Sequence, residues 1–325
     1  MELDRVTIGL VCTRGVGPER GGRVNNEDNY LVCRGNELRY RSGENEVVEY
    51  TPTYGVLLAV ADGMGGHEDG DLASTAAVRA LSRLFRKGAP RDPELELHRF
   101  MLDAHKRLYR KVAELGPVKM GTTLTCCWVV GGRAYWCHVG DSRLYLWRDG
   151  QIKRITRDHT RAEFAHRDGR SIDPENAGYL TQNFVYGSRG FGDDQNIRID
   201  AGTDTGSFEL KARERIILCS DGLSGPVEDH RIAEVVRETP EPQSAATSLM
   251  ERSLASGSDD NVTVIVARVD KPAAQQRFAR VQFEGNDGYD LFGAEDHQLP
   301  GAGDAWDNLR PQGLLPPPPD TDPGF

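Results

Sequence analysis

Short apolar runs that end at an acidic residue followed by glycine are the clearest feature of the hydrophobic pattern. Residues 56–61 are six consecutive small or apolar residues, which predicts a strand buried on both faces. The run ends at Asp62, and three glycines follow within four residues. A second strand-like run, residues 215–220, ends in the same way at Asp221 and Gly222. One such run alone is equally typical of an ordinary turn, but a buried strand can also hold a functional group rigidly at its end.

The rest of the pattern predicts further strands and four helices. The Gly131-Gly132 pair between two strand-like runs predicts a hairpin, so we expect residues 122–147 to form an antiparallel meander. Residues 35–53 are polar and turn-rich, which predicts a hairpin excursion, and Asp71 is expected to cap the first helix. Further strands are expected at residues 6–13, 30–33 and 262–269, and helices at residues 71–87, from 93 onward, 229–238 and 242–256.

Two polar segments lack this periodicity. Residues 161–183 carry many charges, which predicts a mobile surface flap. From about residue 271 onward Gly, Pro, Asp and Gln accumulate, and four consecutive prolines stand near the end, so we expect residues 271–325 to be a disordered tail. A solvated tail and a docking peptide for a partner would both have this composition. The expected organisation is one domain over residues 1–270 followed by this tail.

Composition and charge argue against several classes of protein. The 325 residues carry a formal net charge of −10, whereas a nucleic-acid binder usually presents a basic face. No apolar run approaches the ~20 residues of a membrane helix, and the first residues are too acidic for a signal peptide. We therefore expect a cytoplasmic protein. The six cysteines include no Cys-x-x-Cys motif and lie mostly in strand-like runs, which predicts reduced core residues instead of disulfides or a zinc site.

Carboxylates recur at the ends and turns of the predicted strands. The set comprises the pair Glu27 and Asp28 together with Asp62, Asp141, Asp221 and Asp260. Clustered carboxylates repel one another and raise each other's pKa unless a cation lies among them. Oxygen ligands without His or Cys favour Mg²⁺ or Mn²⁺ over zinc. Two such ions ~3.5–4 Å apart can activate a water and bind a phosphate oxygen, so the pattern predicts a two-metal site.

These carboxylates belong to seven ordered motifs that extend over residues ~5 to 270. The motifs are Arg23…Asn26-Glu27-Asp28, Ala61-Asp62-Gly63-Met64-Gly65-Gly66, Gly121-Thr122-Thr123, Val139-Gly140-Asp141-Ser142-Arg143, Asp158-His159-Thr160, Ser220-Asp221-Gly222-Leu223 and Asp260-Asn261-Val262-Thr263. In these motifs the chain resembles the bacterial members of the protein phosphatase 2C type, the metal-dependent Ser/Thr protein phosphatases. The resemblance implies an α+β fold, an α-β-β-α sandwich of two antiparallel sheets flanked by helices.

The resemblance also implies a metal site at one end of this sandwich. Carried over by position, Asp62 is implied to bridge two catalytic Mn²⁺ or Mg²⁺ ions, and the Gly63 carbonyl to bind one of them. Asp221 and Asp260 are implied to complete the other ion.

Four further residues acquire roles from the same resemblance. Glu27 and Asp28 are implied to hold the water shell of an ion, and Asp141 to contribute to a third, weaker metal site. Arg23 matches the arginine that grips the substrate phosphate, and a guanidinium suits that task because it offers two parallel donors to two oxygens.

The activity implied is hydrolysis of phosphoserine and phosphothreonine by a metal-bridging hydroxide. The implied partners are phosphoproteins, including a cognate Ser/Thr protein kinase and its substrates. Two alternatives remain at this stage. One is a catalytically weak relative that acts as a phosphoprotein-binding or scaffold module, and the other is a phosphatase of small metabolites.

Three departures from the family pattern bear on these expectations. Gly225 stands where many relatives have an acid that helps to bind a third ion, which places that ion in question. Met64 replaces the histidine that some relatives use as a general acid, and His67 is more typical of a solvated turn residue. Residues 187–192 match the family stretch at that place only loosely.

Overall fold

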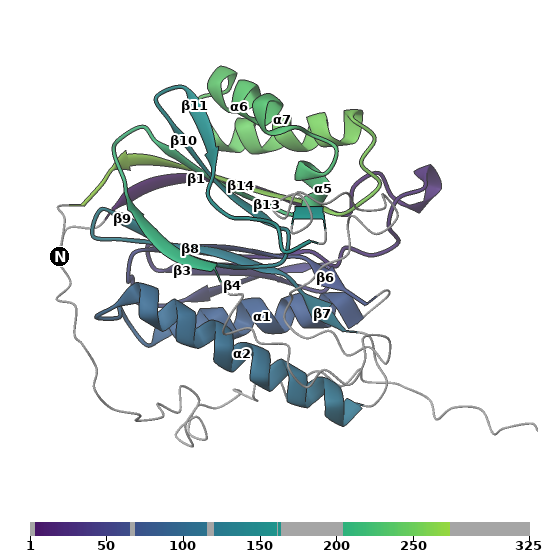
Figure 1. The fold of residues 1–325 in the computed structure, drawn as a ribbon, viewed down its shortest axis with the longest axis horizontal. Helices are drawn as coiled ribbons and strands as arrows, with labels where there is room; N and C mark the ends of the chain where they lie inside the picture. Colours follow the sequence, from purple (N-terminus) through teal and green to yellow (C-terminus); the bar gives the residue numbers. More distant parts are fainter. Residues whose placement is uncertain (1–3, 66–68, 116–119, 161, 164–203, 274–325) are drawn as a thin grey trace, which may run out of the picture.

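The protein forms a four-layer sandwich in which two stacked antiparallel sheets are covered by helices on both outer faces (Figure 1). The computed structural model describes residues 4–65, 69–115, 120–160, 162–163 and 204–273. The expectations for residues 187–192, for His67, for most of the flap 161–183 and for the tail beyond residue 273 lie outside the described residues. Within them the expected α-β-β-α architecture is confirmed.

The larger sheet has seven strands, and two helices cover its outer face. Its strands are, in spatial order, β12 (Asp204–Glu209), β9 (Arg133–Val139), β8 (Leu124–Val130), β5 (Val56–Ala61), β2 (Asn29–Arg34), β3 (Glu37–Ser42) and β4 (Asn45–Tyr50). The covering helices are α1 (Asp69–Arg86) and α2 (Pro93–Leu115). The predicted hairpin excursion is thus confirmed as the pair β3 and β4, at one edge of this sheet.

The smaller sheet has five strands and a helical layer of its own. Its strands are, in order, β1 (Arg5–Thr13), β14 (Val262–Lys271), β13 (Arg215–Cys219), β10 (Arg143–Arg148) and β11 (Gln151–Arg154). The helices packed on it are α6 (Asp229–Glu238) and α7 (Pro242–Ala255). The short helix α5 (Asp221–Ser224) follows β13 directly and lies at the same end of the sandwich as the two-stranded pair β6 (Gly63–Met64) and β7 (Gly121–Thr122) (Figure 1).

The central strand β5 shows why its sequence is apolar throughout. Its residues alternate between two hydrophobic clusters because successive side chains of a strand point to opposite faces. Leu57, Ala59 and Ala61 pack against α1 and α2. The intervening Val56, Leu58 and Val60 pack between the two sheets. Every residue of β5 is buried, as predicted.

Other local expectations meet mixed outcomes. The prediction that Asp71 caps the first helix is wrong, because α1 begins at Asp69 and Asp71 lies inside its first turn. Strand β12 was not predicted, since it contains few apolar residues and is recognisable only from its pairing with β9.

All six cysteines are free thiols, and all except Cys12 are buried. No described helix is both long and apolar enough to cross a membrane.

Candidate metal and phosphate site

The strand register brings the predicted carboxylates to one end of the sandwich. Asp62 follows β5, whose last residue pairs with the first residue of β2, directly after Asp28. In the smaller sheet Cys219 pairs with both Arg143 and Val264, so the chain segments that carry Asp141, Asp221 and Asp260 meet at the same edge. Each sheet therefore contributes acids from neighbouring strands.

The acids from both sheets interact across the gap. Burial raises the pKa of Asp62 well above its usual range, and the charges of Asp221, Asp28, Asp141 and Asp260 raise it further. Burial and Asp260 raise the pKa of Asp221, while a hydrogen bond with Asp62 lowers it. Asp28, Asp62, Asp141 and Asp221 are thus poorly solvated neighbours, and their burial and mutual repulsion favour the protonated or cation-bound form.

Asp141 shows the same effect from the turn between β9 and β10. Burial raises the pKa of Asp141 well above its usual range, and Asp221 and Asp158 add to the shift. Arg143 lies two residues on and forms an ion pair with Asp158 at 2.7 Å. At Gly225 no side chain is available, and its amide donates to the Asp221 carbonyl at 2.6 Å.

Asp28 is held by the opposite sheet. Its Oδ2 accepts hydrogen bonds from Ser220 Oγ and Thr263 Oγ1, both at 2.7 Å. Burial raises the pKa of Asp28 to about 7, although the two hydroxyls lower it and the charges of Asp221 and Asp260 raise it again. Because Ser220 follows β13 and Thr263 lies on β14, this carboxylate ties the two sheets together at the site.

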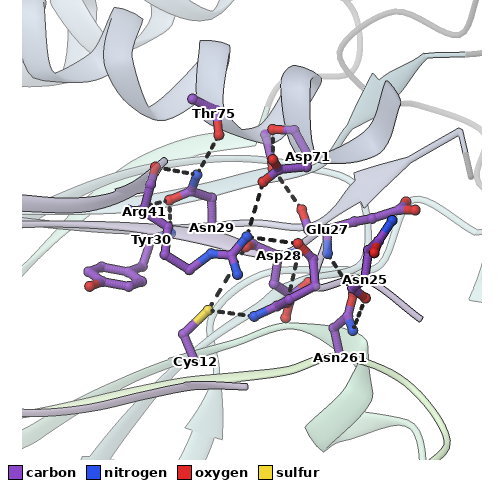
Figure 2. A network of polar contacts seen from close by, with 12 residues as sticks. Cys12, Asn25, Glu27, Asp28, Asn29, Tyr30, Arg41, Asp71, Thr75 and Asn261 are labelled. Carbon is purple, nitrogen blue, oxygen red and sulfur yellow. Dashed lines mark hydrogen bonds and ion pairs between the residues drawn. The ribbon is translucent and has the colours of Figure 1, made fainter. Parts of the chain in front are cut away.

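Glu27 lies in a turn whose backbone is bonded to three other segments, and Figure 2 shows the bond to Asn261. The Glu27 amide donates to Asn261 Oδ1 at 2.8 Å. The Glu27 carbonyl accepts from Ser74 Oγ at 2.6 Å and from the Gly63 amide at 3.2 Å. A methyl group at Gly63 would lie 2.2 Å from the Gly70 carbonyl oxygen, so this glycine is required by close backbone approach.

Arg23 and Asp260 form a two-pronged ion pair. Arg23 Nε contacts Asp260 Oδ1 and Arg23 Nη2 contacts Oδ2, each at 2.8 Å. The hydrogen bonds to Asp260 raise the pKa of Arg23, and the charges of Asp62 and Glu27 contribute as well. The family resemblance implies separate roles for these two residues, phosphate binding for Arg23 and metal binding for Asp260. The structure brings them into direct contact, with the Arg23 side chain 60% exposed.

Buried hydroxyl groups hold the backbone of Asp62 in place, and this role was not predicted. The Asp62 amide donates to Thr123 Oγ1 at 3.0 Å, and Thr122 Oγ1 donates to the Asp62 carbonyl at 3.0 Å. Thr123 Oγ1 is also 2.7 Å from Ser142 Oγ. The motifs Gly121-Thr122-Thr123 and Gly140-Asp141-Ser142 marked these positions, but the partner of each hydroxyl depends on the packing of β7 and β8 against the β9–β10 turn.

The donor set fits a hard divalent cation. The converging acids offer only oxygen atoms, and their burial, followed by their crowding, raises the carboxyl pKa values, which a cation would reverse. Asp221 Oδ1 is buried and has no hydrogen-bond partner. Across the described residues, no three acidic, His or Cys side chains already surround one point as a complete ligand set. Two hydroxyls donate to Asp28 Oδ2, and Arg23 contacts both carboxylate oxygens of Asp260.

The sequence of this chain is similar to those of known phosphatases. The protein phosphatase 2C profile matches residues 49–257. The serine/threonine protein phosphatase PstP of Mycobacterium tuberculosis is 38% identical over 215 residues, which are 66% of this chain and 40% of that relative, so the chain spans well under half of the relative's length.

Solved structures agree with the sequence relatives. The crystal structure of the M. tuberculosis serine/threonine phosphatase PstP/Ppp superimposes with a TM-score of 0.63 at 31% identity and covers 82% of this chain and 99% of that one. The catalytic domain of PstP in complex with two manganese ions gives a TM-score of 0.61 at 33% identity over the same shares of the two chains. On its sequence match and on its fold, this chain belongs to the protein phosphatase 2C family.

Proposed function

We propose that this chain is a metal-dependent protein phosphatase that hydrolyses phosphoserine and phosphothreonine. The observation that carries the proposal is the convergence of carboxylates from both sheets, with mutually raised pKa values, at one end of a protein phosphatase 2C fold. The relatives named as serine/threonine protein phosphatases support the reaction, and the two manganese ions of the PstP catalytic domain support the metal.

The residues that would hold the ions come from both sheets. Asp62 would bridge two ions, with the Gly63 carbonyl on one side and with Asp221 and Asp260 on the other. When bound, Mn²⁺ or Mg²⁺ would lower the pKa of a coordinated water and offset the negative charge of the phosphate. The buried Oδ1 of Asp221 is the atom best prepared for such a ligand role.

Three more acids would serve this centre from outside the bridging set. Glu27 and Asp28 would hold the water shell, since the turn that carries them is fixed by hydrogen bonds from several segments. Asp141 would contribute to a third and weaker ion site. Gly225 removes one carboxylate that such a site would otherwise use, so the proposal rests on two ions.

Arg23 would bind the substrate phosphate. Its guanidinium is largely exposed and lies within the electric field of Asp62 and Glu27, so a phosphate that reaches it lies next to the carboxylate cluster. The two parallel donors that contact Asp260 match two phosphate oxygens equally well. Arg23 can bind a phosphate either by leaving Asp260 or through Nη1 and the second Nη2 hydrogen, which the pair with Asp260 does not use.

The substrates we propose are phosphoproteins, among them a cognate Ser/Thr protein kinase and its targets. The cellular compartment we propose for this chain is the cytoplasm. The catalytic unit would be residues 1–270, with residues 161–183 as a flap and residues 271–325 as a tail. Strand β14, the last strand among the described residues, ends at Lys271, which supports this boundary.

The test is phosphate release from a phosphothreonine peptide, measured with Mn²⁺, with Mg²⁺ and with a chelator. Asp62→Asn is the informative variant, and Asp103→Asn is the matched control, because it makes the same change on α2 outside the cluster. We expect metal-dependent turnover in the wild type and in the control, and a loss of at least about 10³-fold in Asp62→Asn. A folded wild type without turnover under every metal would contradict the proposal and favour the scaffold alternative.

A further inference from the structure

Arg41 is a charged residue buried next to the turn that carries Glu27 and Asp28. It lies on β3, in the hairpin that the sequence analysis treated as an excursion from the core, and it is 8% exposed. Figure 2 shows its guanidinium directed between this turn and helix α1. A guanidinium is rarely buried without paired acceptors, so its contacts indicate what it holds in place.

One guanidinium nitrogen joins the turn to the helix. Arg41 Nη2 donates to the Asn26 carbonyl at 2.7 Å and to Asp71 Oδ1 at 3.0 Å. The carboxylate of Asp71 compensates the buried positive charge, and both bonds are charge-assisted. The Asn26 carbonyl immediately precedes Glu27, so Arg41 acts on the backbone that positions both predicted shell acids.

The main chain of Arg41 is fixed as well. The Arg41 amide donates to Asn29 Oδ1 and Asn29 Nδ2 donates to the Arg41 carbonyl, each at 3.0 Å. Asn29 Nδ2 also donates to Thr75 Oγ1 on α1 at 2.8 Å. Arg41 therefore meets the turn at two places, through its side chain at Asn26 and through its backbone at Asn29.

Each of three successive carbonyls in the turn is held by a different part of the fold. Asn261 Nδ2 donates to the Asn25 carbonyl at 3.0 Å, and Ser74 Oγ donates to the Glu27 carbonyl at 2.6 Å. Arg41 holds the Asn26 carbonyl between them. Loss of Arg41 would release the middle of the turn while its two neighbours stay bound, which loosens the turn without unfolding the domain.

We propose that Arg41 is a positioning residue that sets the affinity of the site for divalent cations by holding the Glu27–Asp28 turn against α1. The inference rests on the proposed function, because it assigns Glu27 and Asp28 to the ions. Residues that orient metal ligands from behind typically contribute ~10- to 100-fold to metal affinity. The physical reason is preorganisation: a turn that is already fixed loses less conformational freedom when an ion binds.

The test measures Mn²⁺ binding directly, by calorimetry and by the electron paramagnetic resonance signal of free Mn²⁺, without substrate. Arg41→Met removes the guanidinium and keeps an unbranched side chain. Arg215→Met is the matched control, since Arg215 is 7% exposed and its side chain donates to the backbone carbonyls of Val236 and Thr239, at the end of α6. We expect Arg41→Met to bind Mn²⁺ ~10- to 100-fold more weakly and Arg215→Met to bind it as the wild type does.

Two further measurements keep the result interpretable. Hydrogen exchange at the amides of residues 26–29 in chelator should accelerate in Arg41→Met and stay unchanged in Arg215→Met. Arg41→Lys retains the charge but lacks the planar fork, so we expect an intermediate Mn²⁺ affinity, and this variant replaces Arg41→Met if the latter does not fold.

The outcomes separate this inference from the proposed function. Wild-type Mn²⁺ affinity in folded Arg41→Met or Arg41→Lys would overturn the role of Arg41, and so would an equal weakening in Arg215→Met. A wild type that binds no Mn²⁺ would also overturn it. If the wild type binds Mn²⁺ and Arg41→Met binds it weakly, but no variant releases phosphate, the positioning role stands and the phosphatase proposal fails.

Discussion

Asp28 and Asp221 are acids of one site, but the fold treats them in opposite ways. Asp28 is buried, and two hydroxyls of the other sheet donate to its Oδ2 at 2.7 Å. Asp221 has a buried Oδ1 without a hydrogen-bond partner and a pKa raised by burial and by Asp260. The first carboxylate is part of the framework that joins the sheets. The second is left ready for a positive ligand, at a cost to the stability of the fold.

This difference shows how one site can be rigid and also bind a cation tightly. The hydrogen bonds that Asp28 Oδ2 accepts from two hydroxyls offset part of the cost of burying this carboxylate, whereas Asp221 Oδ1 accepts none, so a cation would offset more of the cost at Asp221. The two acids should therefore respond differently to mutation and to chelator.

The largest expected effect is that of Asp221→Asn. We expect phosphate release from a phosphothreonine peptide at saturating Mn²⁺ to fall at least about 10³-fold, because a proposed ligand of the ions is lost. In chelator the same variant should melt at a higher temperature than the wild type, because an ionised group with a raised pKa destabilises the folded state. Calorimetric scans with and without Mn²⁺ measure the melting temperature in each condition. A lower melting temperature of Asp221→Asn than of the wild type in chelator would show that Asp221 does not destabilise the metal-free fold.

Asp28→Ala should act in the opposite direction on stability. It leaves the buried hydroxyls of Ser220 and Thr263 without their acceptor and opens a small cavity, so the free energy of unfolding in chelator should fall by about 3 kcal/mol. The measurement is urea unfolding at about pH 4, close to the usual pKa of an Asp carboxyl, where Asp28, with its folded pKa of about 7, is protonated in the folded protein and about half protonated in the unfolded chain. Relief of charge then contributes little, and an increase in stability would place Asp28 in the same class as Asp221.

The stability of the fold should also decrease in acid because of the buried His138. His138 is buried between Thr125 Oγ1 at 2.8 Å and the Arg157 carbonyl at 2.9 Å, and burial lowers its pKa to about 3. A histidine whose folded pKa lies below its unfolded value of about 6.5 stabilises the fold fully above that value and loses this contribution as the pH falls. Between about pH 6.5 and pH 5 the loss amounts to about 2 kcal/mol of unfolding free energy.

The difference between wild type and His138→Gln isolates this contribution. Asp28 shifts stability the other way in acid, because its raised pKa favours the protonated folded form, and it does so equally in both proteins. We expect urea unfolding to show a shallower decline of stability with falling pH in the variant. If the unfolding free energies of the wild type and of His138→Gln declined equally with falling pH, His138 would not be the group responsible for the decline.

Much of the fold follows from the chain's periodicity and turn residues. The fully apolar β5, the Gly131-Gly132 hairpin and the helices α6 and α7 were predicted near their observed positions. Strand β12 was not, because six mainly polar residues carry no periodic signal and form a strand only through pairing with β9. The cap assigned to Asp71 failed because the helix starts two residues earlier.

Which side chains stand at strand ends can be predicted from the chain alone, since an acid directly after a buried apolar run is a local feature of the sequence. The contacts that each acid makes there depend on how the fold packs. Asp28 meets Ser220 across 192 residues, and Arg23 meets Asp260 across 237. Whether a carboxylate oxygen accepts a hydroxyl, pairs with a guanidinium or stays free depends on such distant partners. Local periodicity carries no information about them, because packing of the two sheets brings them together.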